Sequence, residues 1–151
     1  MKQLLTSYGA LALGALALAA PARAADLILD VRGLGSAQGE VMVAVFGDAE
    51  SWLRKPVAVA RQPAAGQKDG VLSLTLKDLP PGALALSVFH DLNGNGRLDR
   101  NLMGIPQEPF AFSNDAVGQF GPPRFEQARF EPNPAGKADA AARVAVKLIG
   151  Q

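Results

Sequence analysis

The chain has 151 residues, with 15 lysines and arginines against 14 aspartates and glutamates, and it has no cysteine. This near-balance of charge lacks the basic surplus that nucleic-acid binding requires, so we expect no nucleic-acid partner. Without cysteine the chain has neither disulfides nor cysteine-ligated zinc. Its stability must therefore come from a packed core, with a bound ion as the available aid.

The first 24 residues follow the three-part pattern of a secretory signal peptide. Lys2 supplies the positive start, and residues 8–20 are glycine, alanine and leucine apart from Tyr8. The segment Ala22-Arg23-Ala24 then places small residues at the two positions that signal peptidase reads. An uncleaved anchor is the alternative, but the apolar run is shorter than the ~20 residues of a spanning helix.

Cleavage after Ala24 would remove Lys2 and Arg23 and leave 13 basic against 14 acidic residues, a net charge of about −1. We expect the remaining 25–151 to form one domain. The predicted location is periplasmic or secreted, without stable membrane insertion after cleavage.

Apolar and polar residues alternate with period two along most of this segment, which predicts half-buried strands. The clearest case is 71–77, where three leucines at even positions oppose Ser73, Thr75 and Lys77. The other expected strands are 26–33, 40–46, 83–90, a shorter one near 124–130, and 143–148. Turns such as Leu79-Pro80-Pro81-Gly82 separate them, and no amphipathic helix of ordinary length is present. This pattern predicts an all-β, antiparallel sandwich.

Two aromatic features do not belong to these strands. Residues 100–123 fit neither period, and their three phenylalanines predict an ordered loop in which Phe110, Phe112 and Phe120 are buried. Trp52 lies in a short turn, where it is expected to close one end of the core. The alternative for Trp52 is stacking on a sugar ring.

One motif carries chemistry, the segment His90-Asp91-Leu92-Asn93-Gly94-Asn95-Gly96-Arg97-Leu98-Asp99. Its spacing matches the first nine positions of the EF-hand calcium loop. Ca²⁺ prefers six to eight oxygens at ~2.4 Å, and alternate residues of a tight loop can point theirs inward. The predicted ligands are the side chains of Asp91, Asn93, Asn95 and Asp99, with Arg97 contributing its backbone carbonyl.

The match to that loop is incomplete, and it leaves alternatives open. The position of the bidentate glutamate is Leu102, so another ligand would have to come from Asn101, Glu108, Asn114 or Asp115. Asn95-Gly96 could instead form a plain polar hairpin turn without metal.

His90, the single histidine, could be a general base oriented by Asp91 in a small hydrolase, with a nucleophile such as Ser113. The alternation instead places it on the face of Leu84, Leu86 and Val88, which favours a hydrogen-bonded histidine at the edge of the core.

The order of motifs resembles a family of exported bacterial proteins catalogued as domain of unknown function 2141. The resemblance rests on GEVMVAVF (39–46), LPPG (79–82), HDLNGNGRLD (90–99), GIP (104–106), FSN (112–114) and FGPP (120–123). It implies export and a single small β domain, and it brings no activity. A looser similarity, carried by the LPPG turn and the aspartate-rich loop, is to the Ig-like/prealbumin-like sandwich modules of bacterial surface proteins.

The expected protein is therefore a small exported module with a binding or structural role, stabilised by calcium in residues 91–99. Its partner would be a protein or a carbohydrate ligand. The alternative is a small periplasmic hydrolase that uses His90 and Asp91.

Overall fold

The computed structural model describes residues 24–132 and 141–150. The strands are β1 (Ala25–Arg32), β2 (Glu40–Phe46), β3 (Ala58–Pro63), β4 (Val71–Leu79), β5 (Ala85–Asp91), β6 (Phe110–Phe112) and β7 (Ala142–Lys147). The short helices are η1 (Ala64–Gly66), η2 (Ser113–Asp115) and α1 (Phe125–Ala128). The predicted signal peptide lies outside the described residues, except for Ala24.

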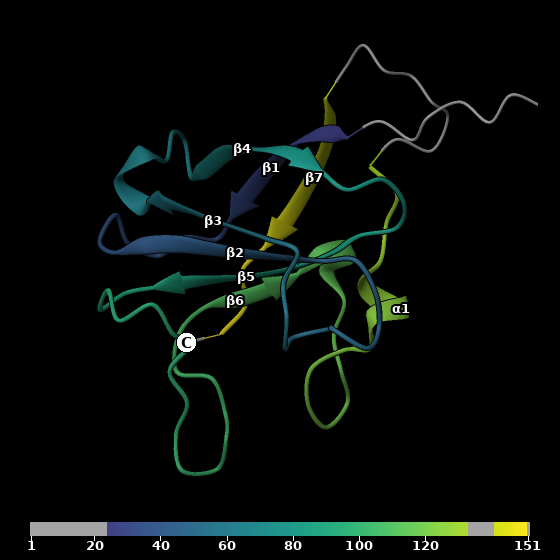
Figure 1. Ribbon diagram of the computed structural model, residues 1–151. Coiled ribbons are helices and arrows are strands. Elements are labelled where there is room, and N and C mark those ends of the chain that lie inside the picture. Colours follow the sequence, from purple (N-terminus) through teal and green to yellow (C-terminus); the bar gives the residue numbers. More distant parts are fainter. Residues whose placement is uncertain (1–23, 133–140, 151) are drawn as a thin grey trace, which may run out of the picture.

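The strands form two sheets that pack face to face (Figure 1). One sheet has three strands in the order β4-β1-β7, and the other has four in the order β3-β2-β5-β6. Every pairing is antiparallel except that of β1 with β7. The predicted all-β sandwich is confirmed, with one parallel pair in addition.

The core lies between the inner faces of the two sheets, as the alternation predicts. In β4 the three leucines Leu72, Leu74 and Leu76 are buried, whereas the serine, threonine and lysine that alternate with them are exposed. Alternate residues of β1, β2 and β5 meet them from the neighbouring strands and the opposite sheet. Each such side chain contributes about 1.5–3 kcal/mol when it is removed from water, so this layer is the main source of stability.

The outer face of the three-stranded sheet is tied together by a carboxylate. Asp30, on the central strand β1, accepts hydrogen bonds from Ser73 Oγ on β4 and Arg143 Nη1 on β7, each at 2.6 Å. The Ser73 hydroxyl, followed by the Arg143 guanidinium, lowers the pKa of Asp30, although burial opposes them. The charged form of Asp30 therefore links all three strands.

The structure differs from the sequence prediction at three elements. Residues 58–63 form an edge strand, β3, that was not predicted, and residues 110–112 of the expected long loop form β6. The predicted strand at 124–130 is wrong, because α1 begins at Phe125 and buries Phe125 and Ala128 on one side. That spacing of three residues fits a helical turn, whereas a strand would place the two side chains on opposite faces.

A second cluster of aromatic side chains closes one end of the sandwich, and Trp52 lies in it as predicted. The centroid of its ring lies 5.0 Å from that of Phe46, 5.7 Å from that of Phe112 and 6.0 Å from that of Phe125. Its Nε1 donates to the carbonyl oxygen of Pro123 at 2.8 Å. This hydrogen bond satisfies the one polar atom of the indole, so the ring can be packed at low cost.

The three phenylalanines of residues 100–123 have different surroundings. Phe112 is buried in the aromatic cluster and Phe110 is half-buried beside it. The predicted burial of Phe120 is wrong, since its side chain is fully exposed. Phe120 lies in a tight bend, in which a Cβ added at Gly118 would meet the carbonyl oxygen of Gly121, so only glycine fits at position 118.

Candidate functional site

The candidate site begins where β5 ends, with His90 and Asp91 on opposite faces of the strand. The side chain of His90 is fully buried, on the same side as Leu86 and Val88, and its Nε2 donates to the carbonyl oxygen of Gln38 at 2.7 Å. Its Nδ1 is buried and has no hydrogen-bond partner among the described residues. Because successive residues of a strand point to opposite faces, Asp91 does not orient His90.

Asp91 turns its carboxylate into the loop that follows. Oδ1 accepts the backbone N–H groups of Gly94 at 2.7 Å and Asn95 at 3.1 Å, and Oδ2 accepts that of Gly96 at 2.7 Å. The two glycines have φ of 74° and 75°, the left-handed conformation that permits this tight course. The residue is 1% exposed, so the loop winds closely around its carboxylate.

The next predicted ligands form two consecutive Asx turns. Asn93 Oδ1 accepts the N–H of Asn95 at 3.0 Å, and Asn95 Oδ1 accepts the N–H of Arg97 at 2.8 Å. The amide nitrogens of both asparagines donate to the carboxylate of Asp99, at 2.6 and 2.9 Å. The structure therefore brings Asn93, Asn95 and Asp99 together, next to the carboxylate of Asp91.

A further carboxylate, that of Glu108, fastens the two ends of this loop. It is 5% exposed, and its two oxygens accept the N–H groups of Leu92 at 2.9 Å and Asp99 at 3.1 Å. Glu108 is one of the four residues from which the sequence predicts the remaining ligand. The other three point elsewhere: Asn101 caps its own turn, Asn114 donates to Arg129 O and Asp115 accepts from Lys147 N.

The chemistry available in the loop is that of oxygen ligands. Carboxylate and amide oxygens have two lone pairs. Asp91 Oδ1 already accepts two hydrogen bonds, whereas Asp91 Oδ2 and Asn93 Oδ1 each accept one and keep further capacity. Hard cations such as Ca²⁺ take oxygens of this kind. Within residues 24–132 and 141–150, no three aspartate, glutamate or histidine side chains converge as a group able to hold one metal ion. The predicted set has only two carboxylates, and calcium binding stays a prediction.

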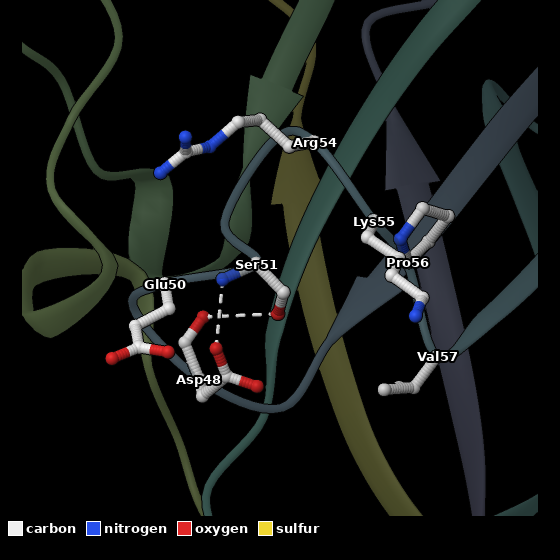
Figure 2. Close-up of a pocket in the computed structure, with 7 residues that line it drawn as sticks. All are labelled: Asp48, Glu50, Ser51, Arg54, Lys55, Pro56 and Val57. Atoms are coloured by element: carbon white, nitrogen blue, oxygen red, sulfur yellow. Dashed lines mark hydrogen bonds between the residues drawn. The ribbon is translucent and has the colours of Figure 1, made fainter.

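A separate hollow of about 670 Å³ lies on the connection between β2 and β3 (Figure 2). It is lined by Asp48, Glu50, Ser51, Arg54, Lys55, Pro56 and Val57. Asp48 Oδ1 accepts the N–H of Ser51 at 2.7 Å, and this bond lowers the pKa of Asp48. Its lining contains both acidic and basic side chains, and all of them are exposed, so we assign no ligand to this hollow.

The fold and this loop define the class of the protein, a β-sandwich with an aspartate–asparagine loop at the end of one inner strand. The chain belongs to DUF2141, a family described as uncharacterized proteins conserved in bacteria, whose model matches residues 29–138. The comparisons with curated proteins and with solved structures give no match. No helix in the described part of the chain is long and apolar enough to span a membrane.

Proposed function

We propose that this protein is an exported β-sandwich module with a binding or structural role, and that Ca²⁺ bound by residues 91–99 stabilises it. The observation that carries the proposal is the inward carboxylate of Asp91, around which the backbone of the loop is wound. A plain hairpin turn needs two special residues, whereas this loop places oxygen-bearing side chains at every second position from Asp91 to Asn95 and ends on Asp99.

The organisation of the loop also supports the proposal. Glu108 clamps the backbone at Leu92 and at Asp99, so the predicted ligands lie between two fixed points. Such preorganisation reduces the conformational entropy that ion binding would otherwise cost. With two predicted carboxylates, we expect a dissociation constant near ~10⁻⁴ M, in the range of extracellular calcium modules.

The geometry gives less support to a hydrolase that uses His90 and Asp91. A general base must lie within hydrogen-bond reach of the proton that it removes. His90 is fully buried and bonded to Gln38, and Asp91 is bonded to the loop amides. Ser113, the candidate nucleophile, is also fully buried, with its Oγ between Leu86 N and Ala128 O. The three groups therefore have separate structural partners.

Thermal melting with chelator and with ~1 mM Ca²⁺ tests the proposal. An ion that binds only the folded state at a dissociation constant near 10⁻⁴ M adds about 1.4 kcal/mol to the free energy of unfolding. For a domain of this size the melting temperature should rise by roughly 5 °C. Mg²⁺ should raise it much less, because it demands a smaller octahedral shell and loses water reluctantly. An unchanged wild-type melt would leave only the polar turn.

Variants assign the response to the loop. Asp91→Ala should lower the baseline and abolish the calcium increment. His90→Ala should also lower the baseline, because it empties a buried site, but it should keep the increment, since imidazole is not a hard oxygen ligand. Asp48→Ala is the matched control, because Asp48 also accepts a backbone N–H in a turn but lies outside the loop. Loss of the increment in Asp48→Ala would contradict the assignment.

Export is tested by the intact mass of the protein recovered from the periplasm or the medium. Cleavage after Ala24 would leave β1 intact, because that strand begins at Ala25. The expected mass is that of residues 25–151. Recovery of the chain in a membrane fraction with residues 1–24 still attached would contradict it.

A further inference from the structure

Strand β4 is the free edge of the three-stranded sheet (Figure 1). At its start the N–H and carbonyl groups of Val71 pair with those of Lys68 in a tight turn, on the side away from β1. Because the backbone groups of every second strand residue point to the same edge, those of Ser73, Thr75 and Lys77 also point away from β1. No strand among the described residues pairs with them, so they are available to a further strand.

The other edges of the two sheets are closed or blunted. Strands β6 and β7 meet through Phe110 and Ile149, whose N–H groups donate to each other's carbonyl oxygens at 2.9 and 2.8 Å. The other free edge, that of β3, ends on Pro63, which has no N–H to donate. Proline on an edge strand prevents pairing with another strand. Strand β4 has nine residues and no proline, so it is the edge that can best accept a partner.

The backbone of β4 fits an antiparallel copy of itself. When Thr75 lies opposite Thr75 of the second copy, Ser73 lies opposite Lys77 of that copy, and every free position of the edge is paired. A register shifted by two residues toward the start of β4 would place Lys77 opposite Val71. The backbone groups of Val71 are already bonded to Lys68, so the register centred on Thr75 uses the edge more fully.

The uncharged side chains also match in this register. On the outer face of the sheet Thr75 lies beside its own copy. On the inner face Leu74 lies opposite Leu76 of the copy, so the leucine layer of the core continues from one sandwich into the next. Threonine pairs and apolar pairs across neighbouring strands are both favourable.

Lys77 gains an opposite charge across this interface. It lies beside Ser73 of the second copy, whose Oγ donates to Asp30 at 2.6 Å. Asp30 is bonded on its other side to Arg143, and it is the charged residue in line with Lys77 across the strand pair. A lysine on an edge strand opposes pairing where it meets a like charge, whereas here it faces a neutral serine with a carboxylate behind it.

We propose that β4 pairs with β4 of a second copy of this chain, so that the two three-stranded sheets become one continuous sheet about a two-fold axis at Thr75. About six backbone hydrogen bonds, two for each residue pair, form the contact. A single strand pair is smaller than a standard stable interface, so we expect a transient dimer with a micromolar dissociation constant. The proposal does not depend on calcium, because β4 contains no predicted ligand.

Cysteine cross-linking tests the register directly. The chain has no cysteine, so Thr75→Cys gives the exported protein a single thiol. This thiol would lie opposite its own copy, with the two Cα atoms ~5.5 Å apart, a distance that a disulfide spans. Lys77→Cys is the matched control, because Lys77 is exposed on the same face of the same strand but would lie about 13 Å from its own copy.

Under mild oxidation Thr75→Cys should form a disulfide-linked dimer and Lys77→Cys should remain monomeric. This result supports the proposed register. No dimer in either variant, or equal yields in both, overturns it, because equal yields would come from random collisions.

Sedimentation equilibrium of the protein without introduced cysteine supplies the second measurement. The average mass of the wild type should rise with concentration. Thr75→Pro removes the central N–H of the free edge and breaks no bond to β1, so it should raise the dissociation constant at least about tenfold. Val59→Pro is the matched control, because it makes the same change at the free edge of β3, and it should leave the constant unchanged.

Lys77→Glu is the second variant, since it changes an exposed side chain and keeps the strand backbone intact. It places a carboxylate in line with Asp30 of the second copy and should also weaken the dimer. A wild type that stays monomeric at millimolar concentration overturns the proposal. A dimer that Thr75→Pro and Lys77→Glu leave unchanged overturns it as well, because the copies then meet through another surface.

Discussion

Replacement of Ser113 by alanine should destabilise the domain strongly, although the change removes one atom. Ser113 is fully buried, and its Oγ accepts the N–H of Leu86 at 2.8 Å and donates to the carbonyl oxygen of Ala128 at 2.6 Å. The hydroxyl extends the pairing of β5 with β6 by one hydrogen bond and fixes the end of α1 to the sheet. Leu86 and Ala128 are themselves fully buried, so water does not replace it.

The magnitude follows from the two groups left without a partner. An unsatisfied buried donor or acceptor costs about 1–3 kcal/mol, so Ser113→Ala should lose roughly 3 kcal/mol of unfolding free energy. For a domain of this size that is a fall of roughly 10 °C in melting temperature. Denaturant unfolding, followed by the fluorescence of Trp52, measures the loss.

The matched control is Ser87→Ala, the same chemical change on β5 at the residue that pairs with Phe112. Ser87 is only half-buried, and its replacement should alter stability by no more than about 0.5 kcal/mol. A loss of less than about 1 kcal/mol in Ser113→Ala would refute this account of how β5, β6 and α1 are joined.

Two further outcomes are expected. Because Ser73 and Arg143 lower the folded-state pKa of Asp30, its contribution is present above the unfolded-state pKa of about 4 and is lost as the pH falls below it. The difference in unfolding free energy between wild type and Asp30→Asn should therefore shrink as the pH falls from about 5 to about 3. A difference that grows as the pH falls would contradict a lowered pKa of Asp30. Phe112→Ala should lower the free energy of unfolding by about 3–5 kcal/mol, and Phe120→Ala should leave it nearly unchanged, as denaturant unfolding would show. Equal losses in the two variants would contradict the exposure of Phe120.

The sequence predicts those strands whose alternate residues face the core. Period two is unmistakable where leucine alternates with polar residues, as in 71–77, and there the buried face was assigned correctly. It fails for β3, an edge strand in which Val59 points to solvent and the inward residues, Ala58 and Ala60, are small. Neither face of β3 looks more apolar than the other, so its sequence carries no alternation to read.

Other differences come from tertiary contacts that no local pattern encodes. Phe112 and Phe120 are the same residue type in the same segment, but only Phe112 meets the cluster around Trp52. In the candidate site, the positions of Asp91 and the two asparagines follow from spacing within one loop. Glu108 is nine residues beyond Asp99, and its clamp depends on how β6 returns to β5. Sequence reasoning could place Glu108 among four candidates and could not choose it.

The central proposal, a calcium site in residues 91–99, is tested most directly by calorimetric titration of the metal-free protein with Ca²⁺. We expect one ion per chain, with a dissociation constant near ~10⁻⁴ M. Binding should disappear in Asp99→Asn, which keeps the shape of the side chain and removes its charge, and it should persist in Asp48→Asn. The absence of binding by the wild type at millimolar Ca²⁺, or equal binding by Asp99→Asn, would contradict the proposal.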